Sequence, residues 1–271
     1  RYRCSCCGKR FSGGQKLNAD ALWQHYSQGK QTAAELAKHY NVSRKTIARY
    51  LKKAQTKSVL PTPKTANLII DTTYFGRDYG VMVLLDSISK QALFVDEVAY
   101  ETTALYLATI TAVQEKGTVI RSITCDGRRG LDKLLPGVPM QLCHFHQVQT
   151  VNRYLTRRPK SVAACELREL ALSLKNSTRA GFAGALEAWY ERHKSFINER
   201  STNPITGKSH YTHKRLRSAY NSLKRSLERL FTFERYPELN IHKTTNLLEG
   251  KFADLKRRLS CHQGMRKENK L

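Results

Sequence analysis

Apolar residues between positions 67 and 142 fall into short runs that have the length and spacing of buried β-strands. The first three runs are separated by short polar turns, so we expect them to be antiparallel neighbours. A helical spacing of apolar residues follows, and two more strands come after it. These features predict a mixed five-stranded α/β sheet. The predicted strands are 67–74, 80–87, 91–98, 119–125 and 138–142, and the predicted helices are 102–115 and 128–135.

Residues 145–235 carry no strand signal, and their apolar positions recur at helical spacing. We therefore expect an all-α insertion after the fifth strand, with a loop at 201–207. A last strong helix is predicted at 242–259, where apolar side chains share one side. The insertion helices are predicted at 147–156, 162–175, 180–200 and 214–231.

Three short amphipathic helices are predicted ahead of the sheet, at 17–27, 33–40 and 44–54. Thr32 and Glu35 have the spacing of a capping box, and Ser43 caps the third helix. The pattern resembles the helix-turn-helix of bacterial recombinases and transposases, whose recognition helix enters the major groove. A generic three-helix bundle with a solvated basic face is the alternative. The candidate DNA-binding residues are Ser43, Arg44, Lys45, Thr46 and Arg49.

The net charge of the chain indicates the kind of binding partner more clearly than its apolar content does. The 271-residue chain has a formal charge of +25, which predicts a polyanionic partner. The sequence has no apolar run of the length of a membrane span and no visible signal peptide, so we expect no membrane partner. The odd number and scattered spacing of the cysteines favour a reducing cytosol, and the resemblance to bacterial transposases implies a place at the nucleoid. Basic residues also crowd the insertion, where they indicate contact with DNA or a partner subunit, or else solvated helix faces. They are Arg157, Arg158, Lys160, Arg215, Arg217, Lys224 and Arg225.

Cysteines cluster at the start of the chain. Cys4 and Cys7 form a C-x-x-C knuckle with Gly8 after it, which is half of a tetrahedral Zn²⁺ site. Cys6 is a possible extra thiolate. Because the sequence begins at Arg1 rather than Met, we expect a fragment whose remaining zinc ligands lie upstream; a disordered basic end with reduced thiols is the alternative.

Two acids follow predicted strands. Asp71 lies at the end of the first strand and Asp126 directly after the fourth, while Glu249 lies in the last helix, off the centre of its apolar side. Strand ends in α/β sheets present functional groups. Carboxylates gathered there can hold Mg²⁺ or Mn²⁺. The rival acids are Asp86, Asp96 and Asp132, of which Asp132 is the nearest substitute.

A Cys-x-x-His element, Cys143-His144-Phe145-His146, follows the fifth strand. With this element, the order of the acids and their strand context, the chain resembles the DDE transposases of bacterial insertion sequences related to the Mutator-like superfamily. The resemblance implies a ribonuclease H-like domain with Asp71, Asp126 and Glu249 as metal-binding catalytic residues. It also implies auxiliary roles for Cys143, His146 and Asn246.

The resemblance further implies DNA cleavage at element ends, strand transfer into target DNA, and a homodimer or larger homo-oligomer. Two alternatives remain: a DNA-binding regulator with an inactive nuclease-like domain, and a nuclease that does not join strands. The expected domains are a partial zinc ribbon (1–14), a helix-turn-helix (15–54), a linker (55–66), the first part of the catalytic core (67–156), the helical insertion (157–240) and the last helix of the core (241–271).

Overall fold

The computed structural model describes residues 2–11, 17–54, 61–76, 79–127 and 130–262. The chain forms two compact units, residues 62–251 and residues 1–61 together with 252–271. Parts of the predicted zinc ribbon and linker, residues 12–14 and 55–60, lie outside the described residues. Within the described ranges, no helix has the length and apolar character required to cross a bilayer.

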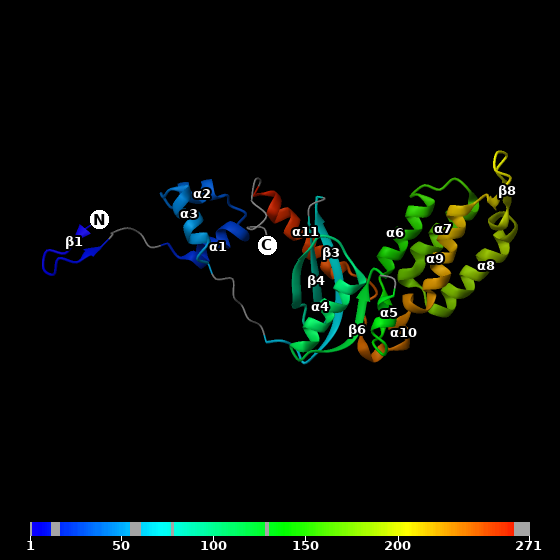
Figure 1. Cartoon of the computed structure of the whole chain (residues 1–271), viewed down its shortest axis with the longest axis horizontal. Coiled ribbons are helices and arrows are strands. Elements are labelled where there is room, and N and C mark those ends of the chain that lie inside the picture. The colour runs from blue at the N-terminus through cyan, green and yellow to red at the C-terminus, as the bar shows by residue number, and fades with distance from the viewer. Residues whose placement is uncertain (1, 12–16, 55–60, 77–78, 128–129, 263–271) are drawn as a thin grey trace. The chain divides into compact units, whose positions relative to one another are not determined.

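A mixed five-stranded sheet organises the larger unit, in the order β5-β4-β3-β6-β7 (Figure 1). Strand β3 pairs antiparallel with β4, and β4 pairs antiparallel with β5. Strands β6 and β7 run parallel to β3. The predicted α/β sheet is confirmed, and its strand order is consistent with a ribonuclease H-like fold. The strands are β3 Thr65–Phe75, β4 Tyr79–Asp86, β5 Ala92–Val98, β6 Val119–Cys125 and β7 Met140–Leu142.

Burial explains why β3 lies at the centre of this sheet. Leu68, Ile69 and Ile70 on β3 are each at most 1% exposed, because both faces of the strand are covered. Helix α4 (Thr103–Glu115) begins at Thr102, whose hydroxyl accepts from the Leu105 N–H. Its buried side chains share a core with β3 and β4. A one-turn helix, α5 (Leu131–Leu134), follows β6.

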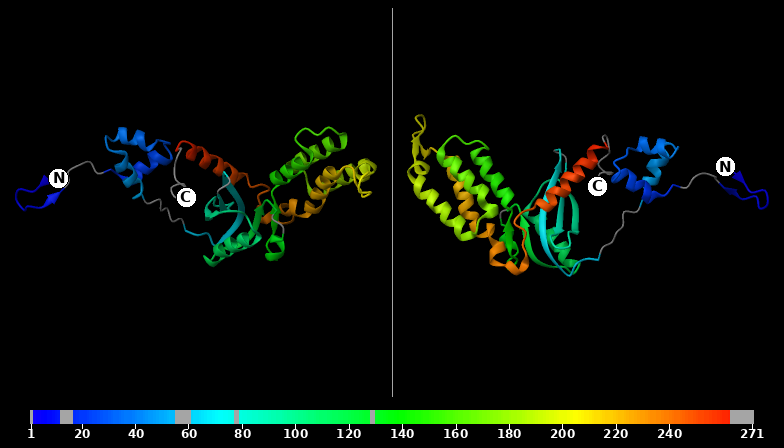
Figure 2. Two further views of the ribbon diagram at one scale, coloured as in Figure 1. Left: turned by 45° about the horizontal axis from the view of Figure 1, so that its top comes forward. Right: turned by 180° about the vertical axis from the view of Figure 1, so that it is seen from behind.

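Helices of the insertion pack side by side next to β7 (Figure 2). Their core includes Leu167, Phe182, Trp189 and Leu223, all nearly fully buried. The insertion comprises α6 His144–Leu155, α7 Val162–Ser173, η1 Leu174–Asn176, α8 Arg179–Asn198, α9 Lys214–Leu230, α10 Thr232–Arg235 and η2 Pro237–Leu239.

The prediction of an all-α insertion is wrong at one place. Strands β8 (Arg200–Thr202) and β9 (Ser209–Tyr211) form a short antiparallel hairpin in and beside the predicted loop. The Asn203 side chain accepts from two backbone N–H groups and so closes the turn. The Arg217 guanidinium lies 3.9 Å from the centre of the Tyr211 ring and fixes β9 to α9. Such short strands with few buried side chains leave no apolar alternation in the sequence.

Among the described residues of 1–61, the smaller unit contains a two-stranded hairpin and three helices. Leu22, Leu36 and Ile47 are fully buried and form the centre of the helical core. The capping box of Thr32 and Glu35 is present. The hairpin consists of β1 Tyr2–Arg3 and β2 Arg10–Phe11, and the three helices are α1 Ala19–Ser27, α2 Ala33–His39 and α3 Arg44–Leu51. Helix α11 (Asn246–Ser260) is the last helix among the described residues, and its part from Phe252 onward belongs to the smaller unit.

Gln141 on β7 joins the sheet to the insertion. It is fully buried, and its Nε2 donates to the carbonyls of Leu230 and Leu142 at 2.7 Å. Its Oε1 accepts from the Phe233 N–H at 3.1 Å. Gln141→Leu leaves these buried groups unpaired, so we expect unfolding free energy to fall by about 3 kcal/mol in urea denaturation. The exposed Gln114 of α4 provides the control, since Gln114→Leu should change stability by less than about 0.5 kcal/mol. Equal effects of the two substitutions would contradict this role.

Candidate metal centre

Asp71 lies where the sheet opens between β3 and β6. The parallel pairing of these strands extends to Ile69 and Thr124, while β3 continues in pairing with β4. Asp71 thus lies just beyond Ile69, the last residue of β3 that pairs with β6. Its Oδ1 accepts from the Thr72 N–H at 2.9 Å, which fixes the carboxylate while leaving it room for a second partner.

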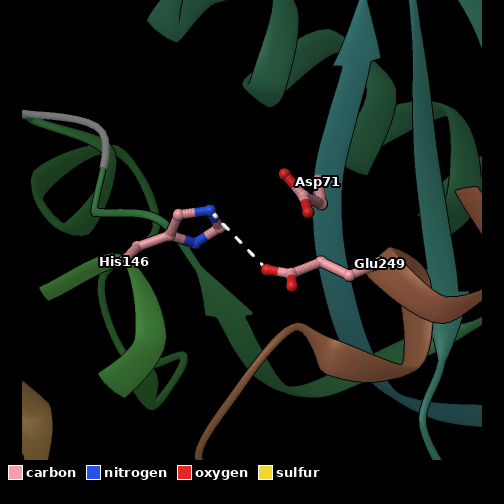
Figure 3. A group of neighbouring side chains, drawn as sticks. All are labelled: Asp71, His146 and Glu249. Atoms are coloured by element: carbon pink, nitrogen blue, oxygen red, sulfur yellow. Dashed lines mark ion pairs between the residues drawn. The ribbon is translucent and has the colours of Figure 1, made fainter. Parts of the chain in front are cut away.

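Two residues distant in sequence meet Asp71 at this opening. His146 comes from the first turn of α6, and Glu249 from the first turn of α11. One ligand atom from each of the three side chains lies within 4.8 Å of the others. Figure 3 shows the three side chains directed toward one another. His146 Nε2 and Glu249 Oε1 are 3.9 Å apart.

The spacing and chemistry of this group fit a divalent cation. A separation of 3.9 Å exceeds a hydrogen bond. It is close to the distance of about 4.2 Å across a cation whose ligands lie at about 2.1 Å. The two carboxylates suit Mg²⁺ or Mn²⁺, whereas an imidazole suits softer metals. Asp71 and Glu249 are therefore the members of the group best suited to a hard cation.

Asp126 lies at the end of β6, exposed, and outside this group of three. The predicted set of acids is therefore brought together in part: Asp71 and Glu249 meet, and His146 is the third neighbour. Asp126 is nevertheless close enough for its charge to raise the pKa values of both Asp71 and His146.

The pKa values of the centre show how its charges balance. Burial, more than any other cause, raises the pKa of Asp71 to about 6, and the negative charges of Glu249 and Asp126 add to this effect. The pKa of His146 is raised to about 9, foremost by the Cys143 side chain and further by Asp71 and Asp126. At neutral pH, His146 is therefore a cation beside two carboxylates. It partly offsets their charge in the place where a metal ion would do so.

Cys143 and Thr245 form contacts that hold the residues of the metal centre in place. Both are buried, and the Thr245 N–H donates to Cys143 Sγ at 3.3 Å. The Thr245 hydroxyl donates to Glu249 Oε1 at 3.4 Å. Burial by itself raises the pKa of the Cys143 thiol, but hydrogen bonds with His146 and Thr245 outweigh it and leave that pKa below its usual value. The Cys-x-x-His element thus contacts the segment that carries Glu249.

Thr245 was not among the residues singled out from the sequence. Its position four residues before Glu249 places the two side chains on one helix face, and this spacing was the available signal. Asn246, in contrast, is exposed, and its backbone N–H is bonded to Thr244 Oγ1. The segment is also held by the Thr124 hydroxyl, which donates to the His242 carbonyl at 2.9 Å.

The rival acids have other structural roles. Asp86 accepts from the backbone N–H groups of Asn67 and Ser89 and so closes the β4–β5 turn. Asp132 lies 3.4 Å from the Arg229 guanidinium. Asp96, at an exposed position on β5, accepts a hydrogen bond from the Glu97 N–H. None of these three belongs to the group formed around Asp71.

Metal affinity should depend on pH in two steps. Protonation of Asp71 removes a ligand, so we expect the affinity for Mg²⁺ to fall as the pH drops through about 6. Protonated His146 repels the cation, so the affinity should rise again as the pH increases through about 9. Calorimetric titration with MgCl₂ between pH 5 and 9.5 measures both steps. His146→Gln should abolish the upper step and move the lower step to higher pH, because the charge of His146 lowers the pKa of Asp71. A single flat affinity over this range would contradict the charge balance.

The predicted zinc knuckle forms the turn between β1 and β2. The Cys4 N–H donates to the Lys9 carbonyl, and Gly8 has a φ of +68°, which a side chain would oppose. Hydrogen bonds to the backbone of Cys7 and Cys6 lower the pKa of Cys4. The lowered pKa favours the thiolate form of Cys4, and the described residues contribute no further ligands to the knuckle.

The predicted DNA-binding residues lie at the start and on the exposed face of α3. Ser43 caps the helix, since its hydroxyl accepts from the Thr46 N–H at 3.1 Å. Arg44, Lys45 and Arg49 are exposed. A shallow surface hollow on this helix is lined by Ser43, Lys45, Thr46, Ala48, Arg49, Lys52 and Lys53.

Comparisons with known proteins add no argument about this chain. No protein-family model matches the chain, and no curated protein matches it. Among solved structures, it is similar to the Drosophila P element transposase strand transfer complex, with 13% sequence identity and a TM-score of 0.35, covering 94% of this chain and 83% of that one. The functional argument therefore depends on the residues of the chain itself.

Proposed function

We propose that the chain is a metal-dependent DNA transposase of the DDE type, which cleaves DNA at the ends of a mobile element and joins the freed strands to target DNA. The observation that carries this proposal is the meeting of Asp71, Glu249 and His146 at the opening of the sheet. A formal charge of +25 supports a nucleic-acid substrate. The proposed family remains the insertion-sequence transposases related to the Mutator-like superfamily.

Asp71 and Glu249 would hold the cation, and Asp126 would complete the acidic set. Bound there, a divalent cation lowers the pKa of an attacking water and offsets charge on the phosphate oxygens. Asp71 is fixed by its bond from Thr72, and Glu249 by its bond from Thr245. Both carboxylates are thus oriented before substrate arrives.

His146 would contribute a positive charge beside the reacting phosphate. Its pKa of about 9 keeps it protonated at neutral pH. A protonated imidazole can donate to a phosphate oxygen and reduce the repulsion between DNA and the acidic centre. Cys143 acts through His146 and Thr245 and is therefore a positioning residue.

Helix α3 would read the ends of the element, with Arg44 and Arg49 meeting bases or phosphates in the major groove. Arg44→Ala with Arg49→Ala should weaken binding to DNA carrying the element's end, and should lower the slope of log affinity against log salt by about 2. Fluorescence anisotropy over a NaCl series measures both. Exposed Lys116→Ala with Arg121→Ala removes the same charge outside the helix-turn-helix as a control. Equal losses for the two pairs would remove α3 from the argument.

We also propose a homo-oligomer, association with the nucleoid, and a Zn²⁺ site to which the Cys4–Cys7 knuckle contributes. The basic surface supports DNA as the partner, and the exposed thiols of Cys6 and Cys7 beside Cys4 support the zinc site.

A joining assay tests the central proposal. The full chain is incubated with MgCl₂, a labelled oligonucleotide carrying the element's end, and a supercoiled plasmid. Labelled plasmid is the expected product. Nicked DNA without joined product would indicate a nuclease, and tight binding with no reaction would indicate a regulator; either result overturns the transposase. Chelation of Mg²⁺ with EDTA should stop the reaction without preventing binding.

A further inference from the structure

A basic hollow of about 530 Å³ lies in the insertion, where the α6–α7 connection meets the start of α9. We call it the α6–α9 hollow. Leu155, Ala164 and Leu216 form its buried floor. Its polar and charged rim consists of Thr156, Arg158, Lys160, Ser161, Thr212, His213, Lys214 and Arg215, with Tyr154 and Pro159 beside them.

The charges at this rim have one sign. Arg158, Lys160 and Lys214 are exposed, and none of them forms an ion pair with the described acids. The lining contains no acidic side chain. His213, at the edge, bonds Glu199, which faces it from the end of α8. Several unpaired cations around one hollow repel one another, and an anionic partner would relieve that repulsion.

Arg215 is held in a defined position at this rim. Its guanidinium donates to the Arg153 carbonyl at 2.6 Å, so it links α9 to the end of α6. A guanidinium fixed through one N–H keeps its other donors for a phosphate, which it contacts in a planar geometry. The hollow is therefore better ordered than a set of mobile surface lysines.

Helix α6 connects the hollow to the metal centre. His146 lies in the first turn of α6, and Tyr154 and Leu155 at its end line the hollow. Nine residues at 1.5 Å per residue place these points about 14 Å apart along the helix. In B-form DNA, about 14 Å corresponds to roughly four base pairs at 3.4 Å each.

We propose that the α6–α9 hollow binds the phosphodiester backbone of a DNA duplex about four base pairs from the reacting phosphate. The inference rests on the proposed function and adds a second binding contact with the same DNA. It assigns to Arg158, Lys160, Lys214 and Arg215 the task of holding the duplex in register with Asp71 and Glu249. These residues contact phosphates and carry no base specificity.

A salt titration of the full chain tests the hollow. The probe is a fluorescein-labelled 30-base-pair duplex of arbitrary sequence, and anisotropy gives the affinity over a NaCl series. R158Q/K160Q/K214Q should lower the slope of log affinity against log salt by about 2 to 3, at about 0.9 per lost phosphate contact. The control K90Q/K116Q/R121Q removes three exposed cations of the sheet region and should change the slope by less than 1. Equal slopes for both variants would overturn the inference.

A neutral phosphate gives the position of the contact. A single methylphosphonate four base pairs from the cleaved bond should slow cleavage by the wild-type protein about tenfold and have little further effect on the triple variant. Equal slowing in both proteins would overturn the assignment. If the wild-type protein cleaves no DNA yet the salt slopes differ as expected, the hollow binds DNA and the transposase proposal fails. If strand joining occurs but the slopes are equal, the hollow alone fails.

Discussion

Asp71→Asn and Glu249→Gln should each reduce cleavage of DNA in MgCl₂ by about a thousandfold. The amides keep the shape of the side chains but remove the charges that would hold the cation, and losing several kcal/mol of stabilisation gives a factor of this size. The rate of oligonucleotide cleavage measures the effect. Asp96→Asn, at an exposed position on β5, is the matched control and should retain the wild-type rate. Retention of more than about a tenth of the activity by either variant would contradict the assignment.

The stability of a variant shows whether it has lost a metal ligand or has misfolded. The folded-state pKa of Asp71 is raised to about 6, so its contribution favours folding at low pH and is lost as the pH rises through about 6. Without metal at pH 7, the charged carboxylate therefore destabilises the fold. Asp71→Asn should accordingly unfold at higher urea than the wild type at pH 7 and at a similar concentration at pH 4. An inactive but stabilised variant is hard to attribute to misfolding.

The sheet and part of the centre follow from local sequence. Long apolar runs such as 67–74 and 80–87 predict buried strands, because a strand covered on both faces needs a nearly continuous run of apolar residues. The expectation that Asp71 ends the first strand is wrong, because β3 continues to Phe75; what ends before Asp71 is the pairing of β3 with β6. Glu249 could be placed because it lies off the apolar side of a strong helix. Burial thus determined the features that sequence reasoning found.

Features that depend on contacts between distant segments were harder to predict from the sequence. The meeting of His146 with Glu249 requires α6 and α11 to start at the same edge of the sheet, which no local pattern encodes. The support from Thr245 depends on that same meeting. The β8–β9 hairpin depends on a turn centred on Asn203 and on an Arg217–Tyr211 contact rather than on burial.

Substitution of Asp126 and His146 should decide which of them accompanies Asp71 and Glu249 at the cation. Asp126→Asn should slow DNA cleavage by at least about a hundredfold and weaken Mg²⁺ binding, if the end of β6 brings its carboxylate to the metal. His146→Gln should leave Mg²⁺ affinity at pH 8 equal or higher, because a cation of pKa about 9 is removed from beside the site while Asp71 stays charged. It should slow cleavage by about tenfold, through loss of a charged contact to phosphate.

Calorimetry with MgCl₂ and a cleavage assay on the same two variants give both measurements. Asp132→Asn is the control for Asp126, since Asp132 is already paired with Arg229 and should be replaceable without loss of Mg²⁺ affinity. The opposite pattern, in which His146→Gln loses the metal and Asp126→Asn retains it, would replace the acidic triad by Asp71, His146 and Glu249. That donor set contains an imidazole and would favour a softer cation than Mg²⁺. The choice of metal and the identity of the third ligand are therefore one question, because the ligand that joins the two carboxylates determines which ion the centre prefers.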